Sequence, residues 1–242
     1  MLTNNDAKLI NSLVKKKSRQ KYNKFIVEGP KIIEEVLNSN IFVHKIYSTD
    51  DIFEKFSEKT EIITERELKK ISQLVSPNTA VALCEIPNQK KIITDGFILA
   101  LDDVRDPGNL GTIIRLADWF GISQIVCSNE TVDLYNYKVL QSSMASFLRV
   151  QLNYTDLSEF LSNYPHTVLG TFMDAESIYQ TDFPENAVLL LGNEANGISE
   201  KLFQYISKKI TIPRHGSKQQ TESLNVAMAA GIILGERTSR LN

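Results

Sequence analysis

The chain has 242 residues, of which 42% are hydrophobic and 23% are charged, values typical of a globular protein with one large or two small domains. Its glycine and proline contents are too low for collagen-like or low-complexity chains, and no apolar run approaches the roughly 20 residues that span a membrane. The formal net charge of −2 argues, taken alone, against a nucleic-acid partner.

The distribution of charges and cysteines adds to this picture. Residues 1–90 carry 15 Lys and Arg against 12 Asp and Glu, whereas residues 91–242 carry 12 against 17, so a local positive patch can still hold RNA. Cys84 and Cys127 lie in apolar runs without CxxC spacing and are expected to be buried free thiols rather than a disulfide or a metal site. Because the first residues lack the apolar core of a secretory signal, we expect a cytoplasmic protein.

Residues 1–88 are predicted to form a small α/β domain, because helical and strand-like periodicities alternate along them. The expected helices cover 1–20, 31–38, 50–57 and 65–71, and the expected strands cover 25–27, 42–47, 61–63 and 79–86. A basic stretch in this domain is either a solvated helix end or a patch that contacts phosphates. Its members are Lys15, Lys16, Lys17, Arg19, Lys21 and Lys24.

A polar linker, residues 89–95, is expected to lead into a second domain, residues 96–242. The expected strands cover 97–101, 122–127, 167–172, 187–191 and 209–213, and the expected helices cover 110–120, 136–146 and 224–237. Several of these strands are continuous apolar runs, which indicates a mainly parallel sheet covered on both faces. Ligands of such sheets bind in loops beyond the carboxyl ends of the strands, and three loops follow strands in this way.

The first loop, residues 102–109, leads into the helix over 110–120, with Asn109 as its expected N-cap. Leu110, Ile113 and Ile114 share the apolar face of that helix, whereas Arg115 lies off it. Arg115 is therefore either a surface arginine or a cation directed at a phosphate or ribose.

The second loop, residues 191–199, contains Gly192 and Gly197 at the spacing of a phosphate-binding loop. Ile198 stands where such a loop needs its lysine, which disfavours a nucleotide hydrolase. Glu194 in this loop is expected to orient a neighbouring group. In the third loop, residues 212–223, His215 is a weak acid–base candidate. Ser223 at the end of this loop and Asn225 just after it either only cap the last helix or also serve a site.

Together these loops resemble the three motifs of the SpoU (TrmH-type) RNA ribose methyltransferases of the SPOUT superfamily. The motifs read Asn109-x-Gly111-Thr112-Ile113-x-Arg115, then Leu191-Gly192-Asn193-Glu194-x-x-Gly197-Ile198, then Ile212-Pro213 with Ser223-Leu224-Asn225-Val226. The segment Phe25-Ile26-Val27-Glu28-Gly29-x-Lys31 resembles the start of the family's N-terminal substrate-binding domain. In this sequence Arg214 follows Ile-Pro where members often have Met, and a long polar loop, 214–222, follows.

The resemblance implies a catalytic domain with a deep trefoil knot, an exception to the usual unknotted topology, and a small N-terminal α/β RNA-binding domain. It also implies a homodimer. The implied reaction transfers a methyl group from S-adenosylmethionine to a ribose 2′-hydroxyl of RNA, with ribosomal RNA as the favoured substrate. A tRNA methyltransferase and a non-catalytic RNA-binding assembly factor are the alternatives.

Site residues follow from the same resemblance. The catalytic set is Asn109, Arg115, Glu194, Ser223 and Asn225, and the cofactor set is Thr171, Leu191, Gly192, Gly197, Ile212 and Leu224. The RNA-binding set is the basic stretch together with Arg214 and Lys218. Arg115 either orients the hydroxyl or accepts its proton transiently with help from a neighbouring phosphate, because a guanidinium ordinarily stays protonated.

Overall fold

The computed structural model describes residues 2–216 and 223–241. The chain falls into two compact units. The N-terminal unit comprises the described residues of Met1–Gln89 together with Asp133–Leu148, and the C-terminal unit comprises those of Lys90–Val132 and Arg149–Asn242. The segment Asp133–Leu148, which the sequence assigned to the second domain, thus lies within the first unit.

Side-chain contacts explain why this segment belongs to the N-terminal unit. The guanidinium of Arg19 lies 2.9 Å from the Asp133 carboxylate, and the rings of Phe25 and Tyr135 are 4.6 Å apart between centroids. These contacts join residues more than a hundred positions apart in the sequence. The hydrophobic periodicity of the sequence, which is a local pattern, cannot predict them.

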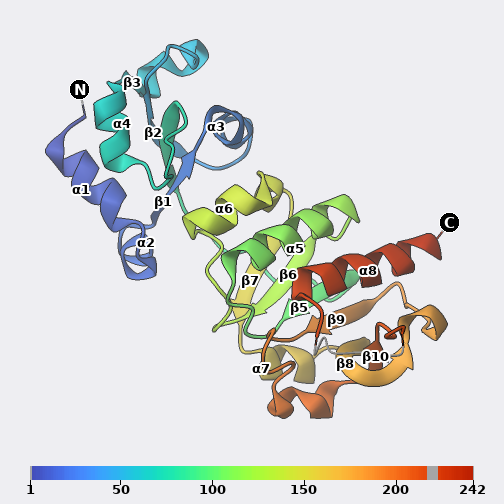
Figure 1. The fold of residues 1–242 in the computed structure, drawn as a ribbon. Coiled ribbons are helices and arrows are strands. Elements are labelled where there is room, and N and C mark those ends of the chain that lie inside the picture. The colour runs from blue at the N-terminus through green and yellow to red at the C-terminus, as the bar shows by residue number, and fades with distance from the viewer. Residues whose placement is uncertain (1, 217–222, 242) are drawn as a thin grey trace. The chain divides into compact units, whose positions relative to one another are not determined.

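The N-terminal unit contains a four-stranded sheet in the order β1-β4-β2-β3, in which β4 is antiparallel to both β1 and β2, and β2 is parallel to β3 (Figure 1). Its elements are α1 (Asn4–Ser12), α2 (Lys16–Tyr22), β1 (Lys24–Glu28), α3 (Pro30–Leu37), β2 (Val43–Ser48), η1 (Glu54–Lys59), β3 (Thr60–Ile62), α4 (Glu65–Ile71), β4 (Ala80–Glu85), α6 (Tyr137–Ser143) and η2 (Ser146–Leu148). The alternating α/β pattern of the sequence is therefore confirmed in this unit.

The predicted helix over 1–20 is wrong as a single helix. It is interrupted between Ser12 and Lys16. Arg19 donates hydrogen bonds to the carbonyls of Leu13 and Val14, each at 2.8 Å, and so satisfies backbone acceptors left without helical partners at the end of α1.

The C-terminal unit is built on a six-stranded sheet in the order β10-β8-β9-β5-β6-β7. All of its pairings are parallel, which confirms the predicted sheet. Its elements are β5 (Phe97–Leu101), α5 (Pro107–Trp119), β6 (Gln124–Ser128), β7 (Gln151–Thr155), α7 (Leu157–Ser162), β8 (Thr167–Ser177), η3 (Ile178–Gln180), β9 (Ala187–Leu191), η4 (Glu200–Tyr205), β10 (Lys208–Thr211) and α8 (Val226–Ser239).

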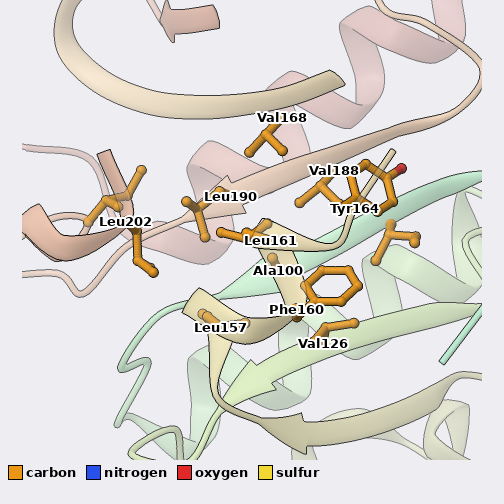
Figure 2. Packing of buried hydrophobic residues seen from close by; sticks show 12 residues of the cluster. Ala100, Val126, Leu157, Phe160, Leu161, Tyr164, Val168, Val188, Leu190 and Leu202 are labelled. Atoms are coloured by element: carbon orange, nitrogen blue, oxygen red, sulfur yellow. The ribbon is translucent and has the colours of Figure 1, made fainter. Parts of the chain in front are cut away.

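Helices cover both faces of this sheet. α7 and η4 lie on one face, and α5 and α8 pack together on the other (Figure 1). Figure 2 shows Leu157, Phe160 and Leu161 of α7 among sheet residues such as Val126 and Leu190, all of them buried. This packing fixes the strand ends from which the three loops emerge.

Two further observations concern the whole described chain. None of its helices is both long and apolar enough to cross a membrane. Cys84 and Cys127 are buried free thiols, and burial raises the pKa of both. The predicted trefoil knot stays a prediction that the strand order permits.

Candidate functional site

The site begins at the N-terminus of α5. Asp106 is the N-cap of this helix, and its carboxylate accepts a hydrogen bond from the Asn109 backbone N–H at 2.8 Å. The predicted capping role of Asn109 is therefore wrong. Since Pro107 occupies the start of the helix, the cap falls one residue before it, and the Asn109 side chain is available for other partners.

The Asn109 amide joins the other two loops. Its Nδ2 donates to Glu194 Oε1 at 2.6 Å, and its Oδ1 accepts from Asn225 Nδ2 at 2.8 Å. The structure thus joins three of the five predicted catalytic residues, one from each motif, by two hydrogen bonds. We call this hydrogen-bond network the amide relay and define it as Glu194, Asn109 and Asn225.

Asn225 has a second role as the N-cap of α8. Its Oδ1 accepts hydrogen bonds from the backbone N–H groups of Ala227 and Met228 at 3.0 and 3.2 Å. Ser223 is exposed and precedes the cap, so its predicted capping role is wrong. One side chain therefore couples the start of α8 to the start of α5.

The glycine-containing loop folds back on itself. The backbones of Asn193 and Gly197 exchange two hydrogen bonds of 2.9 Å, and a Cβ placed on Gly192 would lie 2.2 Å from the carbonyl carbon of Gly197. The N–H groups of Ala195 and Asn196 are bonded to the Asn193 side chain at 2.9 and 3.1 Å. These backbone N–H groups already have partners within the loop, so they are not available to bind a phosphate. The loop therefore lacks free donors for a phosphate as well as the lysine of a phosphate-binding loop.

The same loop is fastened to the first loop by contacts that sequence reasoning missed. Asn193 Nδ2 donates to the Asp103 carbonyl at 2.8 Å, and the Ser199 N–H donates to the buried Asp102 carboxylate at 2.7 Å. The Asp102-Asp103 pair directly after an apolar strand was the only available signal. These bonds hold the Glu194 loop in place against the strand ends.

The predicted cofactor residues come from neighbouring strands. β9 ends at Leu191 and pairs with β8 as far as Gly170, after which Thr171 donates its hydroxyl to the Leu190 carbonyl at 3.2 Å. Ile212 directly follows β10. In the pairing of β10 with β8, Lys209 lies opposite Gly170 and the next residue, Ile210, lies opposite Glu176. Residues 171–175 of β8 therefore bulge out of this pairing.

The chemistry of this edge suits an adenosine. The Leu224 side chain, 48% exposed, offers apolar surface next in sequence to Asn225 of the amide relay. A mostly apolar lining with few polar groups is typical of sites for small cofactors. The residues present thus fit S-adenosylmethionine, whereas no group of His, Cys, Asp or Glu among the described residues is arranged to hold a metal ion.

Arg115 is exposed on α5 and is not a member of the amide relay. It follows Asn109 by six residues, about 9 Å along the helix axis. Within the described part of the chain, no hydrogen bond or ion pair involves its side chain. The Arg115 side chain is therefore exposed to solvent on α5.

The predicted RNA-binding residues divide into different environments. Arg19 is buried, and its guanidinium is occupied by Asp133 and two carbonyls, so its predicted RNA contact is corrected to a structural role. Lys24 lies 2.6 Å from His44 Nε2. Exposed positions are occupied by Lys15, Lys16, Lys17, Lys21 and Arg214, and Lys218 lies outside the described residues.

Comparisons with known proteins agree with this geometry. Residues 96–235 match the SpoU rRNA Methylase family, and residues 4–82 match an MRM3-like substrate binding domain. The chain is 32% identical to the 23S rRNA (guanosine(2553)-2′-O)-methyltransferase RlmP of Bacillus subtilis (strain 168), with 90% of each chain covered.

Two solved structures share the whole architecture. One is a TrmH-family protein from Porphyromonas gingivalis, 33% identical, with a TM-score of 0.91 and 99% of each chain covered. The other is an AdoMet-bound rRNA methyltransferase from Sinorhizobium meliloti, 28% identical, with a TM-score of 0.89 over 100% of this chain and 97% of that chain. The chain belongs to the SpoU rRNA methylase family, whose activity is S-adenosylmethionine-dependent methylation of RNA.

Proposed function

We propose that this methyltransferase acts on ribosomal RNA and methylates a ribose 2′-hydroxyl. The observation that carries the proposal is the amide relay, because it joins the three motif loops at the carboxyl edge of the parallel sheet. The names of the Bacillus subtilis and Sinorhizobium meliloti relatives, both rRNA methyltransferases, support ribosomal RNA over tRNA.

The proposed division of labour follows from the donors and acceptors present. S-adenosylmethionine, when bound, supplies a methyl group already activated on a sulfonium. Arg115 carries only hydrogen-bond donors, so we assign it to the 2′-oxygen and the adjacent phosphate, which it orients. The amide relay positions the loops around the reacting groups, and such positioning accounts for much of the rate when two substrates must meet in line.

The cofactor set is proposed on the same basis. Leu191 ends β9 and Gly192 follows it, Ile212 follows β10, and Thr171 lies within β8 just beyond its last pair with β9. Leu224 adds exposed apolar surface. Gly197 keeps the loop closed with a φ of +67°, which favours glycine. Ser223 and Arg214 are proposed to contact the RNA or the reacting ribose, together with Lys218.

The working form is proposed to be a homodimer in the cytoplasm. The helices α5 and α8 expose Trp119 at 84% and Met228 at 62%, and large exposed apolar side chains on packed helices are typical of interaction sites. Trp119 follows Arg115 by one helical turn, so a second copy on this face would also shield Arg115 from water.

The proposal is tested by methyl transfer from labelled S-adenosylmethionine to unmodified 23S rRNA and to unmodified tRNA. We expect label in the rRNA. The Arg115→Ala variant should lose at least about a hundredfold in transfer rate while binding RNA with nearly unchanged affinity. Arg66→Ala, at an exposed arginine of α4, is the matched control and should keep full activity.

Each other result of this experiment would support a different function or a different role for Arg115. Label in tRNA alone would replace the proposed substrate class. A wild-type protein that binds S-adenosylmethionine and RNA but transfers no label would support a binding module. Unchanged transfer by Arg115→Ala would overturn the assignment of that residue.

A further inference from the structure

We infer that a groove between α1, α2 and α4 of the N-terminal unit binds the sugar–phosphate backbone of the substrate RNA. The groove encloses about 750 Å³. It lies entirely within the first 89 residues. The inference rests on the proposed function, because it names where the substrate of that reaction is held.

Helix α1 is divided into an apolar and a polar side. Ile10 and Leu13 are buried with Leu68 and Ile71 of α4 in the core of the unit. The residues that line the groove recur at helical spacing on the other side, namely Asn4, Lys8 and Asn11. The apolar side accounts for the stability of the helix, whereas core packing does not require the lysine and amides of the polar side.

The two walls of the groove are joined to each other. Asn11 Nδ2 donates a hydrogen bond of 2.9 Å to the carbonyl of Lys70, in the last turn of α4. This exposed side-chain-to-backbone hydrogen bond, together with the core packing of α1 against α4, holds the two helices of the groove together. Lys15 and Ser18 extend the lining to α2.

The chemistry of the lining selects an anion with several charges. Lys8, Lys15 and Lys70 come from three separate segments, so their ammonium groups can meet different phosphates of one chain. The remaining polar groups of the lining are amides and hydroxyls, and none of the described residues that line it is acidic. A surface of lysines with neutral polar groups and no carboxylate is suited to RNA phosphates.

This location differs from the basic stretch seen in the sequence. Arg19 is excluded, because it is buried and paired with Asp133. Lys8 and Lys70 are added, although neither belongs to the stretch of residues 15–24. Folding, rather than sequence proximity, gathers the cations.

The test compares two double variants that change the net charge equally. Lys8→Gln/Lys70→Gln removes two lysines from the groove. Lys55→Gln/Lys69→Gln removes two exposed lysines of the same unit that do not line it. Lys69 and Lys70 are neighbours on α4, so this control separates position from charge.

The measurements are the Kd of the 242-residue chain for an unmodified 23S rRNA transcript over a range of salt concentrations, and the KM and kcat of methyl transfer. We expect the groove variant to weaken binding by about tenfold at low salt and to reduce the slope of log K against log salt by about 2, or about 1 per lysine. Its kcat at saturating RNA should be unchanged, and the control variant should behave like the wild type.

Equal changes in RNA affinity for the two double variants, or no change for either, would overturn the proposal that the groove binds RNA. Failure of the proposed function has a different signature, because the wild-type protein would then transfer no label to rRNA. A groove variant that weakens RNA binding in that case would still support the inference about the binding surface.

Discussion

Asn109 connects the chemistry of the site to individual hydrogen bonds. Its amide faces a carboxylate on one side and a second amide on the other, so its Nδ2 donates to Glu194 while its Oδ1 accepts from Asn225. The hydrogen bonds thereby fix which side-chain atom of Asn109 is the oxygen and which is the nitrogen. A residue in this position can be removed without disturbing the helix cap, which belongs to Asp106.

We predict that Asn109→Ala lowers kcat for methyl transfer by about a hundredfold, because the loops of Glu194 and Asn225 lose their common partner. Asp106→Ala is the matched change on the same helix turn. It should cost about 1 kcal/mol of stability through the lost cap, with a much smaller effect on kcat. Thermal unfolding and steady-state kinetics of both variants decide the matter, and equal kcat losses would contradict the relay.

Arg19 provides a second prediction at the residue scale. Its side chain is 4% exposed and that of Asp133 is 15% exposed, so Arg19→Ala leaves a largely buried carboxylate without its partner. We expect a loss of about 3 kcal/mol, measured as faster amide exchange within 133–148. RNA affinity of the folded protein should stay close to that of the wild type. A stable variant with weakened RNA binding would restore the interpretation of Arg19 as a phosphate contact.

The residue types of the site could be predicted from the sequence, but their connections could not. The motifs identified Asn109, Glu194 and Asn225. Their hydrogen bonds, however, link positions separated by 85 and 116 residues, and no local pattern reports such pairs. The capping prediction for Asn109 failed for a local reason, since Asp106 before Pro107 is the better cap.

At the scale of elements, the loop from Gly192 to Ile198 is held by backbone contact. A Cβ at Gly192 would lie 2.3 Å from the Ile198 nitrogen, whereas a Cβ at Gly197 would meet nothing within 4 Å. The two glycines are therefore required for different reasons. Gly192 permits close approach of two backbone segments, and Gly197 permits a left-handed turn.

We predict that Gly192→Ala weakens S-adenosylmethionine binding by at least about tenfold, or about 1.4 kcal/mol, because the loop must move away from the strand end. Gly197→Ala should cost about 1 kcal/mol of stability with a smaller change in cofactor affinity. Calorimetric titration with S-adenosylmethionine measures both. Tighter or unchanged binding by Gly192→Ala would show that this loop does not form the cofactor site.

Most elements of the sheet could be predicted because they are continuous apolar runs. β7 and α7 were missed, and the reason is visible in their residues. β7, with the sequence QLNYT, is an edge strand only partly buried, so it lacks the apolar run that marked its neighbours. α7 has only six residues, too few to establish a helical period.

At the scale of the whole molecule, the exposed apolar side chains of α5 and α8 lead to a prediction about assembly. Trp119→Asp should yield a monomer in analytical ultracentrifugation, because it places a charge in the proposed interface. The fold should persist, since Trp119 is 84% exposed. Methyl transfer should fall with the loss of the dimer.

The control for this prediction is Val75→Asp, at a fully exposed apolar residue of the N-terminal unit. It introduces the same charge far from α5 in the chain and should leave assembly unchanged. A dimer that survives Trp119→Asp would place the interface elsewhere, and a wild-type monomer with full activity would remove the dimer from the mechanism.

The most direct test of the account is the identity of the methylated nucleoside. RNA labelled by the wild-type protein and S-adenosylmethionine is digested to nucleosides, which are then separated and counted. The account predicts label in a 2′-O-methylnucleoside, and at least about a hundredfold slower labelling when Arg115 is replaced by alanine. Label in a base-methylated nucleoside, or equal 2′-O-methylation by Arg115→Ala, would contradict the assignment of this site to ribose methylation.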